Sequence, residues 1–284
     1  MLLLPVHTPL LKPGDDLASA IIKGGALQSG DIVVVSSKAV ATVENAFIEL
    51  ASMSISHEAQ ECSTRCGRSA GFCQAVLGEL KRLNGEIIGN CPGALLTEVQ
   101  PEGPMKGTIL TANAGLDESN APTGMAIGWP RDPVLSIRKL KEVLESLLVN
   151  GWLVNSYGTM NHKPLTNKPT SKVKELKTAS HIGIILTDSC CHPRRSGVTA
   201  FALAVSGIDP LVSQQGKKDL FGKPLQITTE AVADQLATAA NFLMGNAGQS
   251  TPSVVIRDHG LRLSNFEGWV PGIERDEDLF RGII

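Results

Sequence analysis

The sequence is poor in aromatic residues and has no cluster of basic residues. Phe, Trp and Tyr make up 4% of the 284 residues, and the formal net charge is −2. Proteins that bind nucleic acids neutralise phosphates with clustered Lys and Arg, and many stack bases on aromatic rings. The composition therefore argues against a nucleic-acid partner.

Long apolar runs are also absent. A membrane-spanning helix needs about 20 consecutive apolar residues, and no stretch of this sequence approaches that length. The apolar start, Met1–Pro5, carries no basic residue and is too short for the apolar segment of a signal peptide. We expect a cytoplasmic protein without a membrane partner.

Several common binding motifs are missing as well. No two of the six cysteines are spaced as Cys-x-x-Cys, so a zinc site of that kind is not predicted, and free thiols fit a reducing compartment. The chain has neither Gly-x-x-x-x-Gly-Lys-Ser/Thr nor Gly-x-Gly-x-x-Gly. A bound nucleotide would therefore be held by neither a P-loop nor a Rossmann turn.

The most informative stretch that is present spans 182–197. Ile182–Leu186 is apolar and predicts a buried strand, and Val198–Val205 predicts a second one. Between them lie oxygen-bearing and basic side chains, namely Thr187, Asp188, Ser189, His192, Arg194 and Arg195. Such oxygens suit a hard cation, and arginines suit phosphate or carboxylate oxygens. A loop with a capping aspartate and solvated arginines explains these residues equally well.

A second apolar run also ends in polar residues. Ile109–Ala112 predicts a short strand, and the turn that follows carries Asp117. If Asp117 and Asp188 meet at neighbouring strand ends, they form a cation site that phosphate oxygens and water complete. The alternative is that each aspartate caps its own turn.

Two further segments could contact phosphates. Ile32–Val35 predicts a buried strand that ends in Ser36-Ser37-Lys38, which is either a phosphate contact or an ordinary helix start. A Gly-containing stretch, 244–250, follows an expected helix that starts at Thr229. Its backbone N–H groups could surround an anion, although most such stretches only end a helix.

The remaining segments complete the expected organisation. Apolar spacing predicts helices over 70–83 and from Ser136, which can cap its helix, to Leu148. The proline-broken stretch Gly89–Gly107 reads as a loop, and 150–180 as an exposed polar insertion. We expect residues 1–257 to form one domain in two lobes, followed by a C-terminal tail, 258–284.

With these stretches in place, the sequence resembles the coenzyme F420-0:L-glutamate ligases, the F420 γ-glutamyl ligase family. The matching stretches occur in family order: Thr-Pro-Leu-Leu-Lys-Pro-Gly-Asp-Asp-Leu at 8–17, Gly-Asp-Ile-Val-Val-Val-Ser-Ser-Lys at 30–38, Thr-Ala-Asn-Ala-Gly-Leu-Asp-Glu-Ser-Asn at 111–120, Thr-Asp-Ser at 187–189 with Arg195 and Gly197, Lys-Asp-Leu-Phe-Gly at 218–222, Ala-Asp-Gln-Leu at 233–236, and Leu-Met-Gly at 243–245.

The resemblance implies a mixed α+β, two-lobed fold and a homodimer. It implies a ligase that uses GTP or ATP with Mg²⁺ or Mn²⁺ to activate an acceptor carboxylate as an acyl phosphate. The amine of L-glutamate then attacks, and the acceptor is F420-0 or a similar molecule.

The resemblance also implies roles for individual residues. Asp188 and Arg195 would be catalytic, and Asp117, Asp188 and Ser189 would hold the metal. The residues that would surround the nucleotide are Thr8, Pro9, Leu10, Leu11, Ser37, Lys38, Asn120, Met244, Gly245, Asn246, Ala247, Gly248, Gln249, Ser250 and Thr251.

Three departures from the family pattern keep other functions open. Thr42 stands where the family usually has lysine, and Asn246 where it has a metal-binding glutamate. The stretch Cys190–Arg194 replaces a Phe-Gly-Arg-Pro-Trp-like sequence. A folate γ-glutamyl ligase is therefore one alternative, and a non-catalytic nucleotide- or pterin-binding relative is another. Thiol catalysis by the Cys190-Cys191-His192 stretch is a weaker third.

Overall fold

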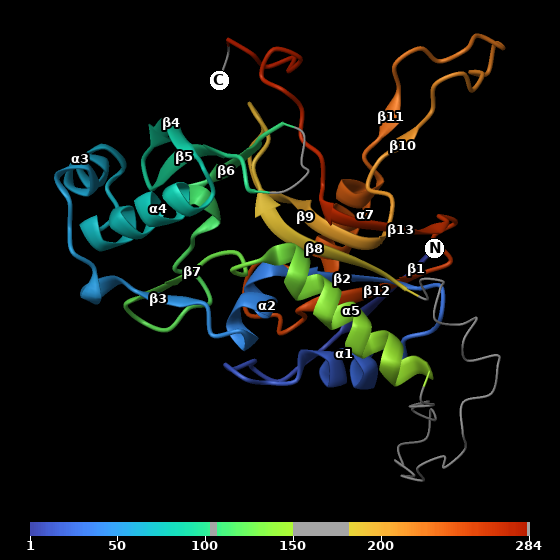
Figure 1. The fold of residues 1–284 in the computed structure, drawn as a ribbon, viewed down its shortest axis with the longest axis horizontal. Helices are drawn as coiled ribbons and strands as arrows, with labels where there is room; N and C mark the ends of the chain where they lie inside the picture. The colour runs from blue at the N-terminus through green and yellow to red at the C-terminus, as the bar shows by residue number, and fades with distance from the viewer. Residues whose placement is uncertain (103–106, 150–181, 283–284) are drawn as a thin grey trace.

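The computed structural model describes residues 1–102, 107–149 and 182–282. At its centre lies a six-stranded sheet with the strand order β1-β12-β2-β8-β9-β13 (Figure 1). Its strands are β1 (Leu2–Val6), β12 (Ser253–Arg257), β2 (Ile32–Ser36), β8 (Gly183–Cys190), β9 (Thr199–Ile208) and β13 (Leu263–Trp269). β2 and β8 run parallel, and the other neighbouring pairs are antiparallel.

Both faces of this sheet are covered. Successive apolar side chains along its strands point to opposite faces, so each face needs a layer packed against it. Val33 and Val35 of β2 belong to one buried cluster, and Ile32 and Val34 belong to the other. Helices α1 (Leu17–Gly25) and α5 (Pro133–Val149) pack on the first face, and α7 (Val232–Met244) packs on the second. With both faces occupied, a site on this sheet must form at the strand ends.

A smaller lobe lies beside the central sheet (Figure 1). It contains a three-stranded sheet packed with helices: β4 (Glu86–Cys91), β5 (Ala94–Val99), β6 (Ile109–Ala112), α3 (His57–Cys66) and α4 (Ala70–Arg82). The connecting elements are α2 (Ser37–Val43), β3 (Phe47–Glu49), η1 (Leu50–Ser52), η2 (Asn113–Gly115) and β7 (Met125–Ile127). The predicted fold class, mixed α+β in two lobes, is confirmed.

The prediction of a loop over Gly89–Gly107 is wrong for its first half. β4 and β5 form an antiparallel hairpin there, with Pro92 and Gly93 in the turn. Gly93 has φ +89°, a conformation that glycine adopts without strain. Pro92 lies in the turn and does not interrupt either strand, since a proline in a turn removes no ladder hydrogen bond.

Two predicted helix starts are also wrong. α5 begins at Pro133, and the Asp132 carboxylate, not Ser136, accepts a hydrogen bond from the backbone N–H of Leu135 at 2.9 Å. Proline suits the first helical turn, because its missing N–H has no partner there anyway. Thr229 lies in a short strand, β11 (Thr229–Glu230), that pairs with β10 (Val212–Ser213), and α7 starts only at Val232.

Two boundaries of the central sheet differ from those expected. β8 continues past Leu186 to Cys190, so Asp188 and Ser189 lie within the strand and not in a loop after it. The expected tail, 258–284, contributes β13, which pairs with β9 at the edge of the sheet. Its alternation is weak because its buried residues, Trp269 among them, come only at its end.

Other expectations concern the cysteines, the insertion and the membrane. The six cysteines all lie among the described residues and are free. The expected insertion at 150–180 lies outside the described residues. Within the ranges described above, no helix has the length and apolar character needed to span a bilayer.

Candidate functional site

Four neighbouring strands bring the predicted site segments to one edge of the central sheet. The register pairs Val6 with Ser253, Ser253 with Val35, and Val35 with Leu186. The end of β1, the start of β12, the end of β2 and the polar part of β8 are therefore adjacent. The segments that adjoin these positions, namely 8–11, 37–38, 187–189 and 244–251, emerge at the same edge.

Backbone hydrogen bonds hold two of these segments together. The Thr8 N–H donates to the Ser250 carbonyl oxygen at 3.0 Å, and the Ser36 N–H donates to the Pro252 carbonyl oxygen at 2.9 Å. The loop before β12 thus lies against the turn after β1 and against the start of α2. Pro9, Leu10 and most of the 244–251 loop are exposed, so a ligand can reach this edge.

Lys38 connects α2 to the loop that carries Asp117. Its Nζ donates to Asp117 Oδ2 at 2.6 Å and to the Ser119 hydroxyl at 2.9 Å. Burial alone would raise the pKa of Asp117, but the hydrogen bonds from Lys38 and Ser119 outweigh it and lower the pKa to about 2. Asp117 is therefore ionised, and Lys38 supplies a positive charge beside it.

Trp129 links the second aspartate to the same loop. Its Nε1–H donates to Asp188 Oδ2 at 2.6 Å, and its ring is buried against Phe201 and Trp269. Gly115, with φ +80°, lies so close to this ring that a Cβ atom there would be 2.5 Å from it. Trp129 therefore contacts both the Asp188 carboxylate and the turn that leads to Asp117.

The environment of Asp188 differs from that of Asp117. Burial raises the pKa of Asp188, while the hydrogen bond from Trp129, the backbone N–H of Ser189 and the charge of Lys38 oppose this rise. Lys38 thus acts on both aspartates, and its contact with Asp117 joins segments 79 positions apart in sequence. Titratable groups whose pKa values are shifted in opposite directions by their surroundings are typical of functional sites.

Ser189 extends the site toward the end of α7. Its hydroxyl donates to Asn246 Oδ1 at 2.8 Å. Asn246 belongs to the 244–251 loop, so this contact joins β8 to the predicted nucleotide-binding segment. The amide of Asn246 offers a neutral oxygen at this position.

Three residues singled out from the sequence make no such contact. Arg195 is exposed after β8, and its side chain forms no ion pair with the residues that the structure describes. Asn120 is exposed with φ +57°, next to Ser119. Thr42 lies on α2 four residues after Lys38, and residues at this spacing share a helix face.

Sequence reasoning missed Trp129 and Ser119 as members of the site. Trp129 lies in a short segment before Pro130 that carries no motif, and only its indole N–H reveals its contact with Asp188. Ser119 lies in the same turn as Asp117, so the turn itself was the available signal.

The oxygen atoms at this edge of the sheet are of the kind that a hard cation binds. Two carboxylates, the Ser189 hydroxyl and the Asn246 carbonyl are all oxygen ligands, which Mg²⁺ and Mn²⁺ prefer. Among the described residues, no three His, Cys, Asp or Glu side chains are grouped as a metal site. A cation would therefore need oxygens from its substrates as well as from the protein.

The fold and the site define a class: a mixed α+β protein that gathers aspartates, hydroxyls and a lysine at one sheet edge, without a P-loop or a Rossmann turn. A family model described as F420-0:Gamma-glutamyl ligase matches residues 5–151 and 167–258. The chain belongs to this family of ligases.

Curated relatives match over nearly the whole chain. A protein of Archaeoglobus fulgidus named Coenzyme F420:L-glutamate ligase is 33% identical over 270 residues, covering 95% of this chain and 91% of its own length. Proteins of the same name from Methanopyrus kandleri and Methanothermobacter thermautotrophicus are 32% and 31% identical, covering 91% and 96% of this chain and 86% and 96% of their own lengths.

Proposed function

We propose that this chain forms an amide between L-glutamate and the terminal carboxylate of F420-0 or a similar acceptor, with GTP or ATP as co-substrate. The names of the family and of the relatives support glutamate and an F420-like acceptor. The observation that carries the proposal is the meeting of Lys38, Asp117, Asp188, Ser189 and the 244–251 loop at one sheet edge.

The reaction would proceed in two steps. An acceptor carboxylate oxygen attacks the γ-phosphorus, which gives an acyl phosphate and releases the nucleoside diphosphate. The glutamate amine then attacks the acyl carbon, loses a proton and expels inorganic phosphate. Negative charge gathers on phosphoryl oxygens in the first step, so the protein must supply positive charge and not a covalent nucleophile.

The chain's own residues fit these demands. Lys38 provides an ammonium group at the strand edge and holds the Asp117 loop in place. Arg195, exposed and without an ion pair among the described residues, is positioned after β8 to contact phosphate or carboxylate oxygens. The backbone N–H groups of the 244–251 loop, which includes Gly245 and Gly248, would face the nucleotide phosphates.

Asp117, Asp188, Ser189 and Asn246 would hold a Mg²⁺ or Mn²⁺ ion, which neutralises charge on the phosphoryl oxygens when bound. We favour a single ion, because Asn246 supplies no charge for a second one. Trp129 would orient the Asp188 carboxylate, and its ring would exclude water from that side of the site.

Mass spectrometry of the products tests this function. The protein is incubated with L-glutamate, Mg²⁺, either nucleotide and either F420-0 or a folate, and we expect a mass gain of one or more glutamyl units. Asp188→Asn keeps an acceptor for Trp129 but removes the charge, so it should yield no product. Asp209→Asn, the same change at an exposed position, is the matched control.

The acceptor could also be a folate. The observation that favours this alternative is the Cys190–Arg194 stretch, which differs from the family pattern beside Ser189. Thr42 and Asn246 similarly motivate a non-catalytic nucleotide- or pterin-binding protein. Product with folate but not with F420-0 would support the first alternative, and binding without turnover would support the second.

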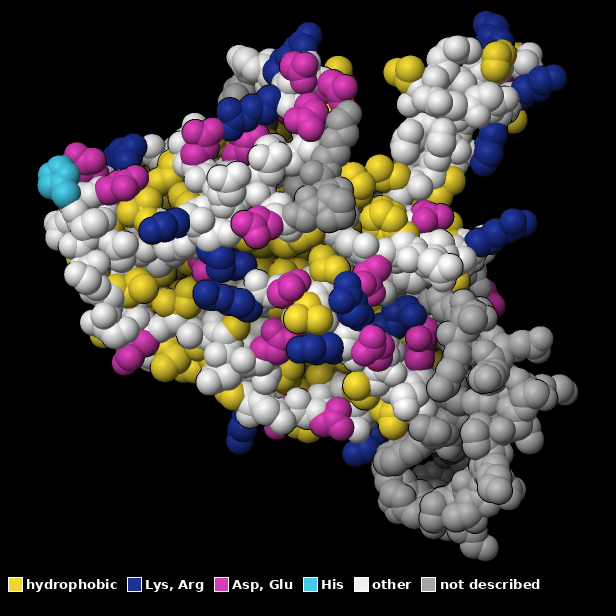
Figure 2. Space-filling view, in the orientation of Figure 1, with side chains coloured by type: hydrophobic (Ala, Val, Ile, Leu, Met, Phe, Trp, Pro, Cys, Tyr) yellow, Lys and Arg dark blue, Asp and Glu magenta, His cyan; other side chains and the backbone are white. Residues whose placement is uncertain are grey.

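We also propose that the chain acts as a homodimer. The segment between β10 and β11 forms an arm that stands clear of the body (Figures 1 and 2). Leu220, Phe221 and Ile227 on this arm are almost fully exposed, which is costly for a monomer in water. Light scattering should give a dimer, the double change L220S/F221S should give a monomer, and Leu279→Ser, also at an exposed leucine, should leave the dimer intact.

A further inference from the structure

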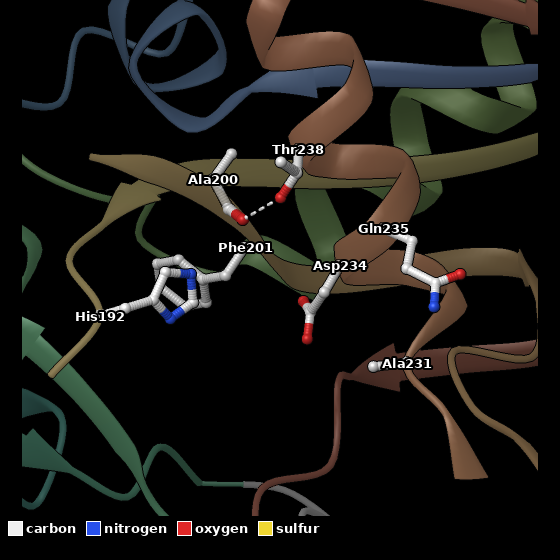
Figure 3. Close-up of a pocket in the computed structure, with 7 residues that line it drawn as sticks. All are labelled: His192, Ala200, Phe201, Ala231, Asp234, Gln235 and Thr238. Carbon is white, nitrogen blue, oxygen red and sulfur yellow. Dashed lines mark hydrogen bonds between the residues drawn. The ribbon is translucent and has the colours of Figure 1, made fainter. Parts of the chain in front are cut away.

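A cavity of about 440 Å³ lies between α7, the start of β9 and the segment after β8, and the proposed function gives it no role. Figure 3 shows the side chains around it. Those that matter here are His192, Ala200, Phe201, Asp234, Gln235 and Thr238. Asp234 and Gln235 belong to the Ala-Asp-Gln-Leu stretch at 233–236, which resembles the family pattern but was assigned no role.

The cavity adjoins the candidate site through the ladder between β8 and β9. Ala200, which lines the cavity, is paired directly with Ser189. Residues opposite each other in an antiparallel pair point to the same face of the sheet. The Ser189 hydroxyl, which contacts Asn246, therefore lies on the face that the cavity occupies. A molecule in the cavity can extend toward Ser189 along this face.

An irregularity in β9 fixes the most distinctive side chain of the cavity. The register between β8 and β9 shifts between Leu186 and Thr187, and the Ala202 N–H donates to Asp234 Oδ1 at 2.8 Å instead of completing the ladder. The second oxygen of Asp234 has no hydrogen-bond partner among the described residues, and the carboxylate points into the open space (Figure 3). Burial raises the pKa of Asp234. Because one oxygen of this partly buried carboxyl group has no protein partner there, the cavity favours a ligand that donates a hydrogen bond to it.

The lining argues against two of the three proposed substrates. No Lys or Arg is among the residues that line the cavity, and His192 is the basic side chain there. The phosphates of a nucleotide would meet Asp234 with little compensating charge, and L-glutamate, whose ammonium could pair with Asp234, would leave its two carboxylates with His192 alone. A neutral ring with N–H groups beside a carbonyl fits better. Asp234 can accept from an N–H group of such a ring. Gln235 Nε2 donates one hydrogen bond to Glu230 Oε2 at 2.7 Å, and its second N–H can donate to the ring carbonyl.

We propose that this cavity binds the heteroaromatic ring of the acceptor through a pyrimidine-type edge, with Asp234 as the hydrogen-bond acceptor. The ring of His192 offers a face on which a planar heterocycle can stack. That the ring belongs to the acceptor rests on the proposed function. A deazaflavin and a pterin both carry an N–H beside a ring carbonyl, and the experiment separates them.

Ring binding can be measured without turnover. The probes are two fluorescent rings that lack the reacting carboxylate, an 8-hydroxy-5-deazaflavin riboside and a 6-hydroxymethylpterin. Each is titrated with the full chain in the absence of glutamate and nucleotide. We expect saturable quenching of one of them, and the ring that binds identifies the acceptor class.

Variants then assign the contact. Asp234→Asn keeps an oxygen for the Ala202 N–H but loses the charged acceptor, so Kd for the ring should rise about 10- to 100-fold. Gln235→Ala, at an exposed position where folding is not at risk, should raise Kd about 2- to 10-fold. Asp209→Asn should leave Kd unchanged, and nucleotide affinity should be equal in all variants.

Two results overturn the inference: neither ring binds the unchanged protein, or Kd stays within about twofold in both the Asp234 and the Gln235 variants. A loss of nucleotide affinity in Asp234→Asn would also contradict it. Glutamylated product is assayed separately, so ring binding that depends on Asp234 without any product contradicts the proposed function alone.

Discussion

The hydrogen bond from Trp129 to Asp188 gives a quantitative test of the site. The Nε1 to Oδ2 distance is 2.6 Å, the indole is buried, and the acceptor is a carboxylate. A hydrogen bond to a charged group contributes about 1.5–3 kcal/mol to stability. Trp129→Phe removes the donor and also part of the ring volume, so the single substitution alone does not isolate the bond.

A double-mutant cycle separates these effects. The four proteins are the unchanged chain, Trp129→Phe, Asp188→Ala, which removes the acceptor, and the double variant, and the assay is the free energy of unfolding in urea at pH 8. The cost of lost ring volume appears in both backgrounds and cancels. We expect a coupling free energy of about 1.5–3 kcal/mol between the two residues. A coupling free energy below about 0.5 kcal/mol would refute the claim that this hydrogen bond stabilises and orients the Asp188 carboxylate.

Three further predictions concern charges around the site and the smaller lobe. Lys38→Met should lower kcat about 10²–10³-fold, and NMR titration should show the pKa of Asp117 rising from about 2, because its main hydrogen-bond donor is gone. Asn246→Glu should lower initial rates with both Mg²⁺ and Mn²⁺, because a new carboxylate would face phosphate oxygens; a rate gain would contradict the preference for one ion. Arg275 holds the pKa of Glu98 below its usual value, so this stabilisation is present above about pH 4.5 and is lost as pH falls through the folded-state pKa. Urea unfolding should therefore show that Glu98→Gln costs less stability at pH 3 than at pH 7.

The central sheet could be predicted because its strands are apolar on both faces. Ile32–Val35 and Ile182–Leu186 are continuous apolar runs, and such runs indicate strands buried between two layers. β4 and β5 were missed because Pro92 and the partly exposed side chains of β4 hide their alternation. Two polar residues before an apolar stripe are typical of a helix start, so a helix was expected from Thr229. In the structure Thr229 and Glu230 pair with Val212–Ser213 and adopt an extended strand conformation.

The site could be predicted in part. Asp117 and Asp188 each follow or extend an apolar strand, and that pattern indicated that their segments meet. Lys38 was expected beside the nucleotide, but its contact with Asp117 joins residues 79 positions apart and depends on how the smaller lobe packs. Trp129 carried no local signal, and the stretch that contains Asp234 matched the family pattern without indicating a role. Their roles arise from an indole N–H that donates to another strand and from a register shift in β9.

Transfer of an oxygen isotope tests the central claim most directly. The acceptor is prepared with ¹⁸O in its terminal carboxylate and incubated with the protein, L-glutamate, Mg²⁺ and the preferred nucleotide. If the carboxylate attacks the γ-phosphorus, one ¹⁸O atom must leave with inorganic phosphate for each amide formed. With the labelled acceptor, mass spectrometry should therefore find one ¹⁸O atom in each inorganic phosphate that the reaction releases. Glutamylated product with unlabelled phosphate would contradict the acyl phosphate, and the absence of any glutamylated product would contradict the ligase function itself.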